Sequence, residues 1–360
     1  MHLARLRLRD FRNYARLDAE FAPGFHVLLG RNAQGKTNLL EAIYLAATLR
    51  SFRGAGGHQL IRHGQQGYFI GARAVGQATR EIGIYWSAAE RRLTLDRQKV
   101  RRLADYLGTL RAVVFCAEDL QLVKGTARVR RRFMDLLLAQ TQPGYLAWLL
   151  RYLQAVRSRN AVLKRMPLDE ALLEGFTDEL VRAGEPIIAA RQRLVPQLAP
   201  LAQSACQSIS SAGETLELSY QPQVRGELRA ALEAQRARER VRRATLVGPH
   251  LDELMLLLQG RPAATFASEG QKRTLALALK MAQAEFLTGA HGVPPILLID
   301  DVMGELDQSR RAGLLPLLER AQHARGQVFM TCTEESWPRE LGRALLRWEV
   351  AEGALKAVPA

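Results

Sequence analysis

The stretch Gly30-Arg31-Asn32-Ala33-Gln34-Gly35-Lys36-Thr37 is a complete match to the pattern GxxxxGK[ST]. Glycines in such a loop let backbone N–H groups curl around phosphate oxygens, and the N-terminus of the following helix adds its positive dipole end. The lysine of the pattern reaches the β- and γ-phosphates of a nucleotide, and the last hydroxyl binds Mg²⁺. We therefore expect residues 30–38, through Asn38, to bind ATP, with Lys36 catalytic and Thr37 on the metal.

The segments on either side of this loop have the pattern that a phosphate loop requires. Residues 25–29 are a short apolar run, which is typical of a buried strand. Residues 36–49 carry apolar side chains at helical spacing. The alternative is a chance glycine-rich turn, but a strand before it and a helix after it favour the nucleotide site.

A pair of acids follows a second apolar run much later in the chain. Residues 296–299 are apolar and are followed at once by Asp300 and Asp301, 264 and 265 positions after Lys36. An acid at the carboxyl end of a parallel strand is the usual second contact of the metal. We expect Asp300 to bind Mg²⁺ and Asp301 to polarise the attacking water, so that both are catalytic. Two solvated loop acids are the alternative.

A third element, Ser268-Glu269-Gly270-Gln271, precedes a helical segment and stands 32 positions before Asp300. Ser268 could simply cap that helix. A serine and a glycine at a helix N-terminus also form a phosphate-binding surface. A second such surface at this spacing resembles the signature of ABC-type ATPases. That resemblance implies that residues 268–271 of one subunit act in trans, covering the γ-phosphate held by another.

The spacing of apolar residues changes twice along the chain. Helical periodicity extends from residue 129 to about 205 and returns over 227–244, whereas strands and helices alternate before and after this region. This pattern predicts an α/β fold interrupted by a mostly α-helical lobe. The resemblance to ABC-type ATPases implies that the α/β part is a P-loop ATPase head with a mixed sheet. We expect the head to comprise residues 1–125 and 245–360 and the helical arm to comprise 126–244.

The composition points to an acidic partner. The 360 residues are enough for about two domains. They include 51 basic and 36 acidic side chains, a net charge of +15, and 44 of the basic residues are arginine. Such a surplus favours nucleic acid as the binding partner. The alternative is that the arginines simply form a solvated surface without a partner. No apolar stretch approaches the length of a membrane span and no signal core begins the chain, so we expect a cytoplasmic protein without a membrane partner.

Over nearly its whole length the chain resembles the RecF family of recombination-repair proteins, relatives of the SMC and Rad50 head ATPases. The matching stretches lie at both ends and in the helical region: residues 8–14, 37–43, 115–120, 124–125, 130–135, 159–164, 248–250, 268–273 and 300–307. Within the last stretch, Glu305 and Asp307 are similar to the D-loop that touches the opposing subunit.

The resemblance implies an ATP-dependent homodimer that clamps duplex DNA or duplex–single-strand junctions. It also implies weak, DNA-stimulated ATP hydrolysis as the switch of that dimer. RecR and RecO are the implied partners, with which the protein would promote RecA loading in gap repair and support the SOS response. The alternatives are an ABC transporter ATPase subunit and a DNA-binding scaffold with a structural ATP site.

Three details depart from related patterns. Transporter ATPases carry a histidine where this chain has Thr331-Cys332-Thr333, so γ-phosphate sensing could pass to a threonine. Asp301 stands where a longer glutamate is common, which favours slow hydrolysis. Leu251 follows Gly248-Pro249-His250, where the family pattern has arginine.

Arginine clusters are the candidate DNA contacts, because guanidinium groups bind phosphates without reading bases. The alternative for each of them is a solvated side chain or a pair with a glutamate such as Glu239. The candidates are Arg130, Arg131, Arg132, Arg159, Arg242 and Arg243.

Overall fold

The first sheet of the computed structural model, which describes residues 1–210, 213–305, 307–323, 326–332 and 345–358, is antiparallel. Its order is β2-β1-β4-β5-β6-β7. Leu6 and Leu8 of β1 are buried while Arg7 and Arg9 are exposed, so the alternating sequence decides which face covers the core. The strands are β1 (His2–Phe11), β2 (Tyr14–Glu20), β4 (Gly67–Val75), β5 (Thr79–Ser87), β6 (Arg91–Leu95) and β7 (Gln98–Lys99).

The second sheet is mixed and has the order β15-β14-β3-β13-β12-β8. All neighbouring pairs are parallel except β14 with β15. Its central strands are mainly apolar and buried, as expected for strands covered on both faces, and His26 of β3 and Gln327 and Thr331 of β13 are their buried polar residues. The strands are β3 (Gly24–Leu29), β8 (Ala112–Phe115), β12 (Ile296–Ile299), β13 (Gln327–Cys332), β14 (Leu345–Ala351) and β15 (Ala354–Val358).

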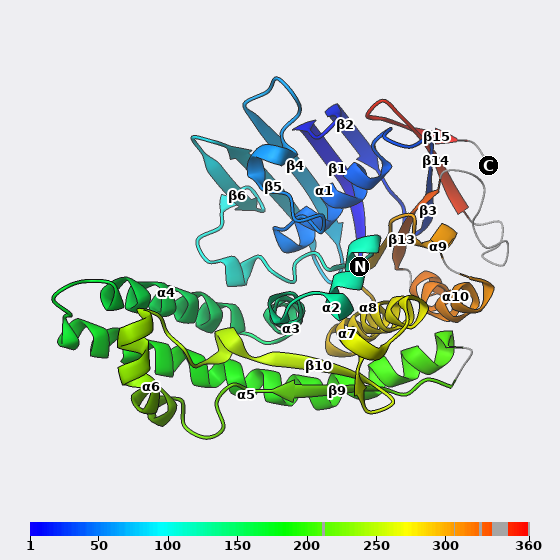
Figure 1. Cartoon of the computed structure of the whole chain (residues 1–360). Coiled ribbons are helices and arrows are strands. Elements are labelled where there is room, and N and C mark those ends of the chain that lie inside the picture. Colours follow the sequence, from blue (N-terminus) through cyan, green and yellow to red (C-terminus); the bar gives the residue numbers. More distant parts are fainter. Residues whose placement is uncertain (211–212, 306, 324–325, 333–344, 359–360) are drawn as a thin grey trace. The chain divides into compact units, whose positions relative to one another are not determined.

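Helix α1 (Lys36–Thr48) belongs to the same hydrophobic core as both sheets (Figure 1). Ile43 of α1 is fully buried in a cluster with Ile70 of the first sheet and Leu298 of the second. This burial fixes the helix axis, and therefore the loop that precedes the helix.

Contacts divide the chain into two compact units, neither of which is continuous in sequence. Unit 1 contains Met1–Leu120, Ser204–Glu214 and Arg273–Ala360, and unit 2 contains Gln121–Gln203 and Thr215–Lys272. Unit 1 holds both sheets described above. It also holds α9 (Val302–Glu305), α10 (Gln308–His323) and most of α8 (Glu269–His291).

Unit 2 consists mainly of helices with one small antiparallel sheet of order β11-β10-β9 (Figure 1). Its longest helix, α5, has 40 residues and continues through three prolines, and the last six of these residues, 204–209, belong to unit 1. The elements are α2 (Gln121–Lys124), α3 (Ala127–Thr141), α4 (Tyr145–Leu163), α5 (Glu170–Ile209), β9 (Leu216–Gln221), α6 (Leu228–Arg242), β10 (Glu253–Leu258), β11 (Arg261–Pro262) and α7 (Ala263–Phe266).

The predicted fold class, an α/β head interrupted by a mostly helical region, is confirmed. The compact units differ from the expected limits of the lobes, 126–244 and the rest. Strand β10 pairs with β9, with Leu254 opposite Tyr220, and this pairing groups residues 245–272 with the helices. The lobe limits themselves stay a prediction.

Candidate functional site

Three parallel strands bring their carboxyl ends together in unit 1. Strand β3 is followed by the phosphate loop and β12 is followed by Asp300. Thr331 is the second-last residue of β13. The register places Thr331 opposite Leu28 and Met330 opposite Ile299. Side chains that are up to 300 positions apart in sequence therefore meet at one sheet edge, as parallel sheets require.

The phosphate loop needs a glycine at its last position. Gly35 is the residue before α1 and has φ 117°, in the region that side chains disfavour. A Cβ atom there would lie 2.7 Å from Nδ2 of Asn13. The glycine therefore permits both the turn and the close approach of the β1–β2 hairpin.

Lys36 is buried under its own loop. Its side chain is only 4% exposed, and its Nζ donates hydrogen bonds to the carbonyl oxygens of Gly30 at 2.6 Å and Arg31 at 3.0 Å. Among the described residues it forms no ion pair. A buried ammonium group with only carbonyl partners provides a positive charge that a phosphate would neutralise. Arg31, Asn32 and Ala33 of the loop are exposed.

Two threonines hold the first acid. Thr37 Oγ1 donates to Asp300 Oδ1 at 2.9 Å, and Thr331 Oγ1 lies 3.1 Å from the same oxygen. Thr331 Oγ1 also accepts from the backbone N–H of Asp301 at 2.9 Å. Thus Thr37 and Asp300, predicted as the metal ligands, are in contact, and Asp301 is joined to them through Thr331.

Burial raises the pKa of Asp300 to about 6, and the charge of Asp301 adds to this shift, whereas the two threonine hydrogen bonds oppose it. A carboxylate that is costly to ionise without a partner suits a site for a hard cation. The oxygen donors of Thr37 and Asp300 are those that Mg²⁺ prefers, with water and phosphate completing its shell. No group of three or more His, Cys, Asp or Glu among the described residues is arranged to hold a metal ion by itself.

Two hairpins fasten the loop at Gln34, a feature that sequence reasoning missed. Asn13, in the β1–β2 turn, donates to the carbonyl of Gln34 at 2.8 Å and accepts from Asn38 at 2.8 Å. The β14–β15 turn adds two backbone donors: Gly353 N–H to the Gln34 carbonyl at 3.1 Å, and Glu352 N–H to Gln34 Oε1 at 2.8 Å. The only sequence signal for the contact between Asn13 and Gln34 was the stretch 8–14, which is part of the resemblance to the RecF family. Nothing in that stretch indicated that it would touch the phosphate loop.

The β1–β2 turn is itself fixed by a buried ion pair. Glu41 of α1 is fully buried and accepts from Arg12 through both carboxylate oxygens, at 2.8 and 2.9 Å. Ser51 donates to the same carboxylate. This bidentate pair anchors the turn that holds Gln34.

The segment 268–271 lies in unit 2 and caps α8. Gln271 N–H donates to Ser268 Oγ at 3.2 Å, and Ser268 N–H donates to Gln271 Oε1 at 2.8 Å, a reciprocal capping box. Glu269 forms ion pairs with Lys124 and, at 3.5 Å, with Lys272. The helix-cap alternative for Ser268 is therefore observed, and its action in trans stays a prediction.

The predicted D-loop is described only in part. Leu306 and the side chain of Glu305 lie outside the described residues. Thr333, the second threonine considered for γ-phosphate sensing, also lies outside them. Asp307 is exposed at the start of α10, where its Oδ1 accepts from Arg310 N–H at 2.9 Å and its carboxylate pairs with the Arg310 guanidinium.

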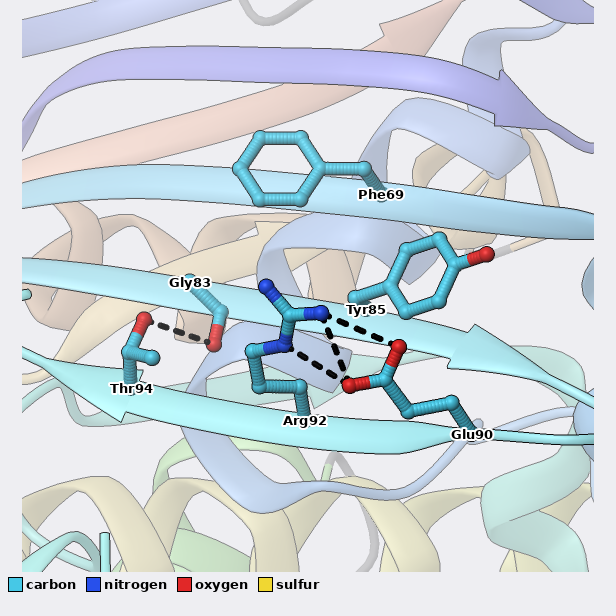
Figure 2. A pocket seen from close by; sticks show the side chains of 6 residues that line it. All are labelled: Phe69, Gly83, Tyr85, Glu90, Arg92 and Thr94. Atoms are coloured by element: carbon cyan, nitrogen blue, oxygen red, sulfur yellow. Dashed lines mark hydrogen bonds and ion pairs between the residues drawn. The ribbon is translucent and has the colours of Figure 1, made fainter. Parts of the chain in front are cut away.

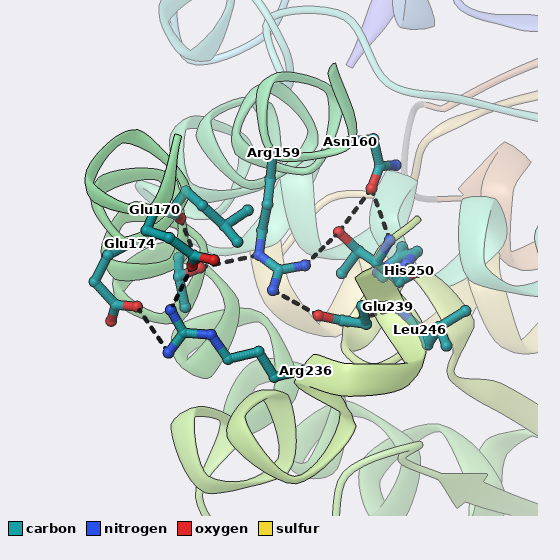
Figure 3. A network of polar contacts seen from close by, with 11 residues as sticks. Arg159, Asn160, Glu170, Glu174, Arg236, Glu239, Leu246 and His250 are labelled. Atoms are coloured by element: carbon teal, nitrogen blue, oxygen red, sulfur yellow. Dashed lines mark hydrogen bonds and ion pairs between the residues drawn. The ribbon is translucent and has the colours of Figure 1, made fainter. Parts of the chain in front are cut away.

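Two of the arginines predicted to contact DNA are structural in unit 2. Arg159 is 2% exposed and donates to Thr177 Oγ1 at 3.0 Å, Thr245 Oγ1 at 3.0 Å and Glu239 Oε2 at 2.6 Å (Figure 3). Arg130 is 8% exposed and pairs with both carboxylate oxygens of Glu253 at 2.7 Å. The prediction for these two is corrected, because their donors are already used inside the unit.

The other four arginine candidates are at least partly accessible. Arg131 is half-buried and donates to the carbonyl of Asp252 at 2.7 Å. Arg132, Arg242 and Arg243 are exposed, and Arg243 is the residue that follows α6. These positions keep their status as candidate DNA contacts.

Residues 2–350 match the family described as RecF/RecN/SMC N terminal domain. The DNA replication and repair protein RecF of Symbiobacterium thermophilum is 39% identical over 360 positions, covering 94% of this chain and 95% of its own. The chain belongs to the RecF family. The RecF protein of Lacticaseibacillus casei is 37% identical over 376 positions and covers 99% of each chain.

Solved structures agree with this membership of the RecF family. The structure of the recombination mediator protein RecF-ATP in the RecFOR pathway superposes with a TM-score of 0.89 at 28% identity, covering 99% of both chains. An Smc head domain from Pyrococcus furiosus has a TM-score of 0.59 at 15% identity, covering 99% of this chain and 96% of its own, and shares the fold. Within the described part of the chain, no helix has the length and apolar character needed to cross a bilayer.

Proposed function

We propose that this chain acts in DNA replication and repair as an ATP-driven molecular switch. The observation that carries this proposal is the contact between Thr37 of the phosphate loop and Asp300 of the strand end, at 2.9 Å. It joins the phosphate-binding and metal-binding groups in one place, as nucleotide hydrolases require. The similar RecF protein solved with ATP supports ATP as the ligand.

Each residue of the site has a distinct proposed task. Lys36 would exchange its two carbonyl partners for the β- and γ-phosphates, and residues 30–38 would surround them with N–H groups. Thr37 and Asp300 would hold Mg²⁺, which neutralises charge on the phosphates when bound. Asp301, joined to Asp300 through Thr331, would orient the attacking water.

Hydrolysis is proposed to be slow. The carboxylate of Asp301 is one methylene shorter than the glutamate of faster relatives, and a water held less closely is polarised less. Slow turnover suits a switch that must stay closed while it is bound to DNA.

The switch would work through a homodimer. Ser268 to Gln271 of one copy would cover the γ-phosphate bound by the other, and Asp307 would contact the opposing copy. The exposed position of Ser268 and its place at a helix N-terminus support this task. The helical lobe would act as the arm that encloses DNA.

The nucleic-acid partner is proposed to be duplex DNA or a duplex–single-strand junction, held through phosphates by the exposed arginines. RecR and RecO are the proposed protein partners, and RecA loading in gap repair and support of the SOS response the proposed outcome. The similar RecF-ATP structure is of a recombination mediator protein in the RecFOR pathway, which supports RecR and RecO as partners. Membership of the RecF family favours this function over a transporter subunit.

Sedimentation velocity tests the switch directly. Wild type, Lys36→Arg and Ser268→Arg would be compared with and without Mg²⁺-ATP and duplex DNA, with Lys99→Arg, an exposed substitution in β7, as the matched control. Wild type and the control should dimerise only with ATP. Lys36→Arg should lose ATP binding and the dimer, and Ser268→Arg should keep ATP binding but lose the dimer.

A dimer that ignores ATP in all four proteins would refute the sandwich. A scaffold with a structural ATP site would dimerise and bind DNA but release no phosphate from ATP. DNA-stimulated phosphate release that Lys36→Arg abolishes excludes that alternative.

A further inference from the structure

The outer face of the first sheet carries a row of five side chains, one from each of five neighbouring strands. The register places Arg9 opposite both Arg16 and Phe69, Phe69 opposite Tyr85, and Tyr85 opposite Arg92. Strands are about 4.8 Å apart, so the row spans roughly 19 Å. None of these residues belongs to the nucleotide site.

Two aromatic rings occupy the centre of this row. Phe69 and Tyr85 are half-buried, and the guanidinium carbon of Arg92 lies 5.9 Å from the centre of the Tyr85 ring. Figure 2 shows both aromatic side chains beside a hollow whose volume is about 380 Å³ and which Glu90, Arg92 and Thr94 also line. Neighbouring aromatic rings rimmed by polar side chains form an apolar patch of the kind that marks interaction surfaces.

The hollow has a backbone floor. Gly71 of β4 lies directly opposite Gly83 of β5, so neither strand has a side chain beside the rings. A Cβ atom on Gly71 would come within 3.0 Å of the Phe69 ring and 3.2 Å of Arg7 Nε. The two glycines therefore let the Phe69 ring and Thr94 lie close against the sheet, so the Phe69 ring is held flat along the floor of the hollow. For the glycines themselves this is a purely structural role.

The charge around the rings is positive. Arg7, Arg9 and Arg16 are all exposed on this face. Arg9 lies 3.8 Å from Asp10, and neither Arg7 nor Arg16 forms an ion pair with another residue in the described part of the chain. Arg92 is balanced by Glu90 at 2.7 Å. Asp18, opposite Arg7 on β2, attracts both Arg7 and Arg16 but is ion-paired with Arg5, so the positive charge on β1 and β2 is only partly compensated and is in excess next to the aromatic pair.

We propose that this face binds single-stranded nucleic acid. Unpaired bases would stack on Tyr85 and Phe69, and Arg9 and Arg16 would bind the adjoining phosphates. Stacking platforms beside basic residues bind single strands with little sequence preference, because every base has a π-face. A duplex keeps its bases stacked inside and offers only phosphates to such a surface. The site does not depend on the ATP switch, and it would hold the single-stranded side of a junction.

Fluorescence anisotropy with a labelled 15-mer of thymidine tests the stacking. Tyr85→Leu should weaken binding by about 5- to 150-fold, the loss that one base–aromatic stack predicts. Tyr85→Phe should stay within about twofold of wild type, since it keeps the ring. Arg97→Ala, an 87% exposed arginine near the same sheet edge, is the matched control and should also stay within about twofold. Thermal unfolding reports whether each variant folds.

If Tyr85→Leu fails to fold, two further measurements test whether this face binds single-stranded nucleic acid. Arg9→Ala with Arg16→Ala should lower the slope of log affinity against log salt by about 1.4, or about 0.7 for each lost phosphate contact. An iodouracil-substituted oligonucleotide should crosslink to Tyr85 or Phe69. Arms with a uridine 15-mer and a 15-bp duplex separate RNA and duplex binding from single-stranded DNA binding.

The proposal is overturned if Tyr85→Leu folds and binds as wild type does, if all crosslinks map away from the sheet, or if the arginine pair leaves the salt slope unchanged. Tyr85→Leu should keep the ATP-dependent dimer of wild type while it loses affinity for the oligonucleotide. That result keeps this site distinct from the proposed switch, because either can fail alone.

Discussion

Thr37 Oγ1 donates a hydrogen bond to Asp300 Oδ1 at 2.9 Å, although the residues are 263 positions apart in sequence. The contact exists because β13 lies between β3 and β12, so that the loop after β3 and the acid after β12 flank Thr331. One carboxylate oxygen thereby meets hydroxyls from two directions. Asp300 is held where a metal ion between it and the loop would be bound.

Asp300→Asn should abolish most ATP hydrolysis while leaving the fold intact. The amide keeps the size of the side chain but loses the negative charge that would bind the proposed metal, and loss of that electrostatic contribution should cost about 100-fold or more in kcat. Thr37→Ser should keep most of the activity, because it keeps the hydroxyl, whereas Thr37→Val should not. Phosphate release at saturating Mg²⁺-ATP measures all three.

The matched control for this set is Asp105→Asn, which changes an exposed acid that pairs with Arg102 at 3.2 Å. It should hydrolyse ATP as wild type does. Retention of more than half of the wild-type rate by Asp300→Asn would contradict the assignment of the metal ligand.

The stability of unit 1 should fall in mild acid because of His26. This side chain is fully buried, its Nε2 lies 2.8 Å from the carbonyl of Ala22, and its Nδ1 accepts from Trp348 Nε1 at 2.9 Å. Both ring nitrogens thus suit the neutral form. Burial lowers the pKa of His26 from 6.5 to about 4.

The sign follows from proton binding. The unfolded chain takes up a proton near pH 6.5 and the folded chain only near pH 4, so the stabilisation is complete above pH 6.5 and is lost between those values. The full difference is about 3 kcal/mol. Chemical denaturation at several pH values should show this decline, and His26→Phe should flatten it. An equal decline in both proteins would refute the role of His26.

Much of this architecture could be predicted from local patterns. The phosphate loop, the apolar strand before Asp300 and the helical region all have strong periodicity or a complete motif. The second fastening of Gln34 could not be predicted. It uses backbone N–H groups of the β14–β15 turn, and any residue except proline at 352 could donate the same bond.

The arginines show a second limit of sequence reasoning. A basic stretch such as residues 128–132 shows that the segment is positively charged. It does not show which of the arginine side chains is buried. Arg130 and Arg159 are buried because carboxylates at 253 and 239, more than 75 positions away, meet them only after folding. Their helical phase does not distinguish them from solvated neighbours.

Removing Arg159 should therefore destabilise unit 2. Arg159→Met should cost about 3–5 kcal/mol of unfolding free energy, because it leaves the carboxylate of Glu239 buried without its partner. The double variant Arg159→Met with Glu239→Leu should recover a large part of that loss. Denaturant unfolding followed by circular dichroism measures both changes.

Arg242→Met and Arg243→Met provide the contrast, because both positions are exposed. Each should unfold like wild type but bind duplex DNA more weakly, with a salt slope smaller by about 0.9 for each lost phosphate contact. Should Arg159→Met weaken DNA binding without any loss of stability, the assignment of Arg159 as structural would be wrong.

Gly353→Ala should weaken ATP binding from outside the phosphate loop. Gly353 has φ +75°, and its added Cβ would lie 2.4 Å from the carbonyl oxygen of Asn13, so the β14–β15 turn would have to move away from Gln34. Gly260→Ala is the matched control, since φ there is +74° but nothing lies within 4 Å of the new atom. Both changes carry the same left-handed strain of about 1 kcal/mol. Only Gly353→Ala should raise the Kd for ATP, by about tenfold if the loop loses roughly 1.4 kcal/mol of positioning. Equal ATP affinity in the two variants, measured by calorimetry, would show that the turn does not position the loop.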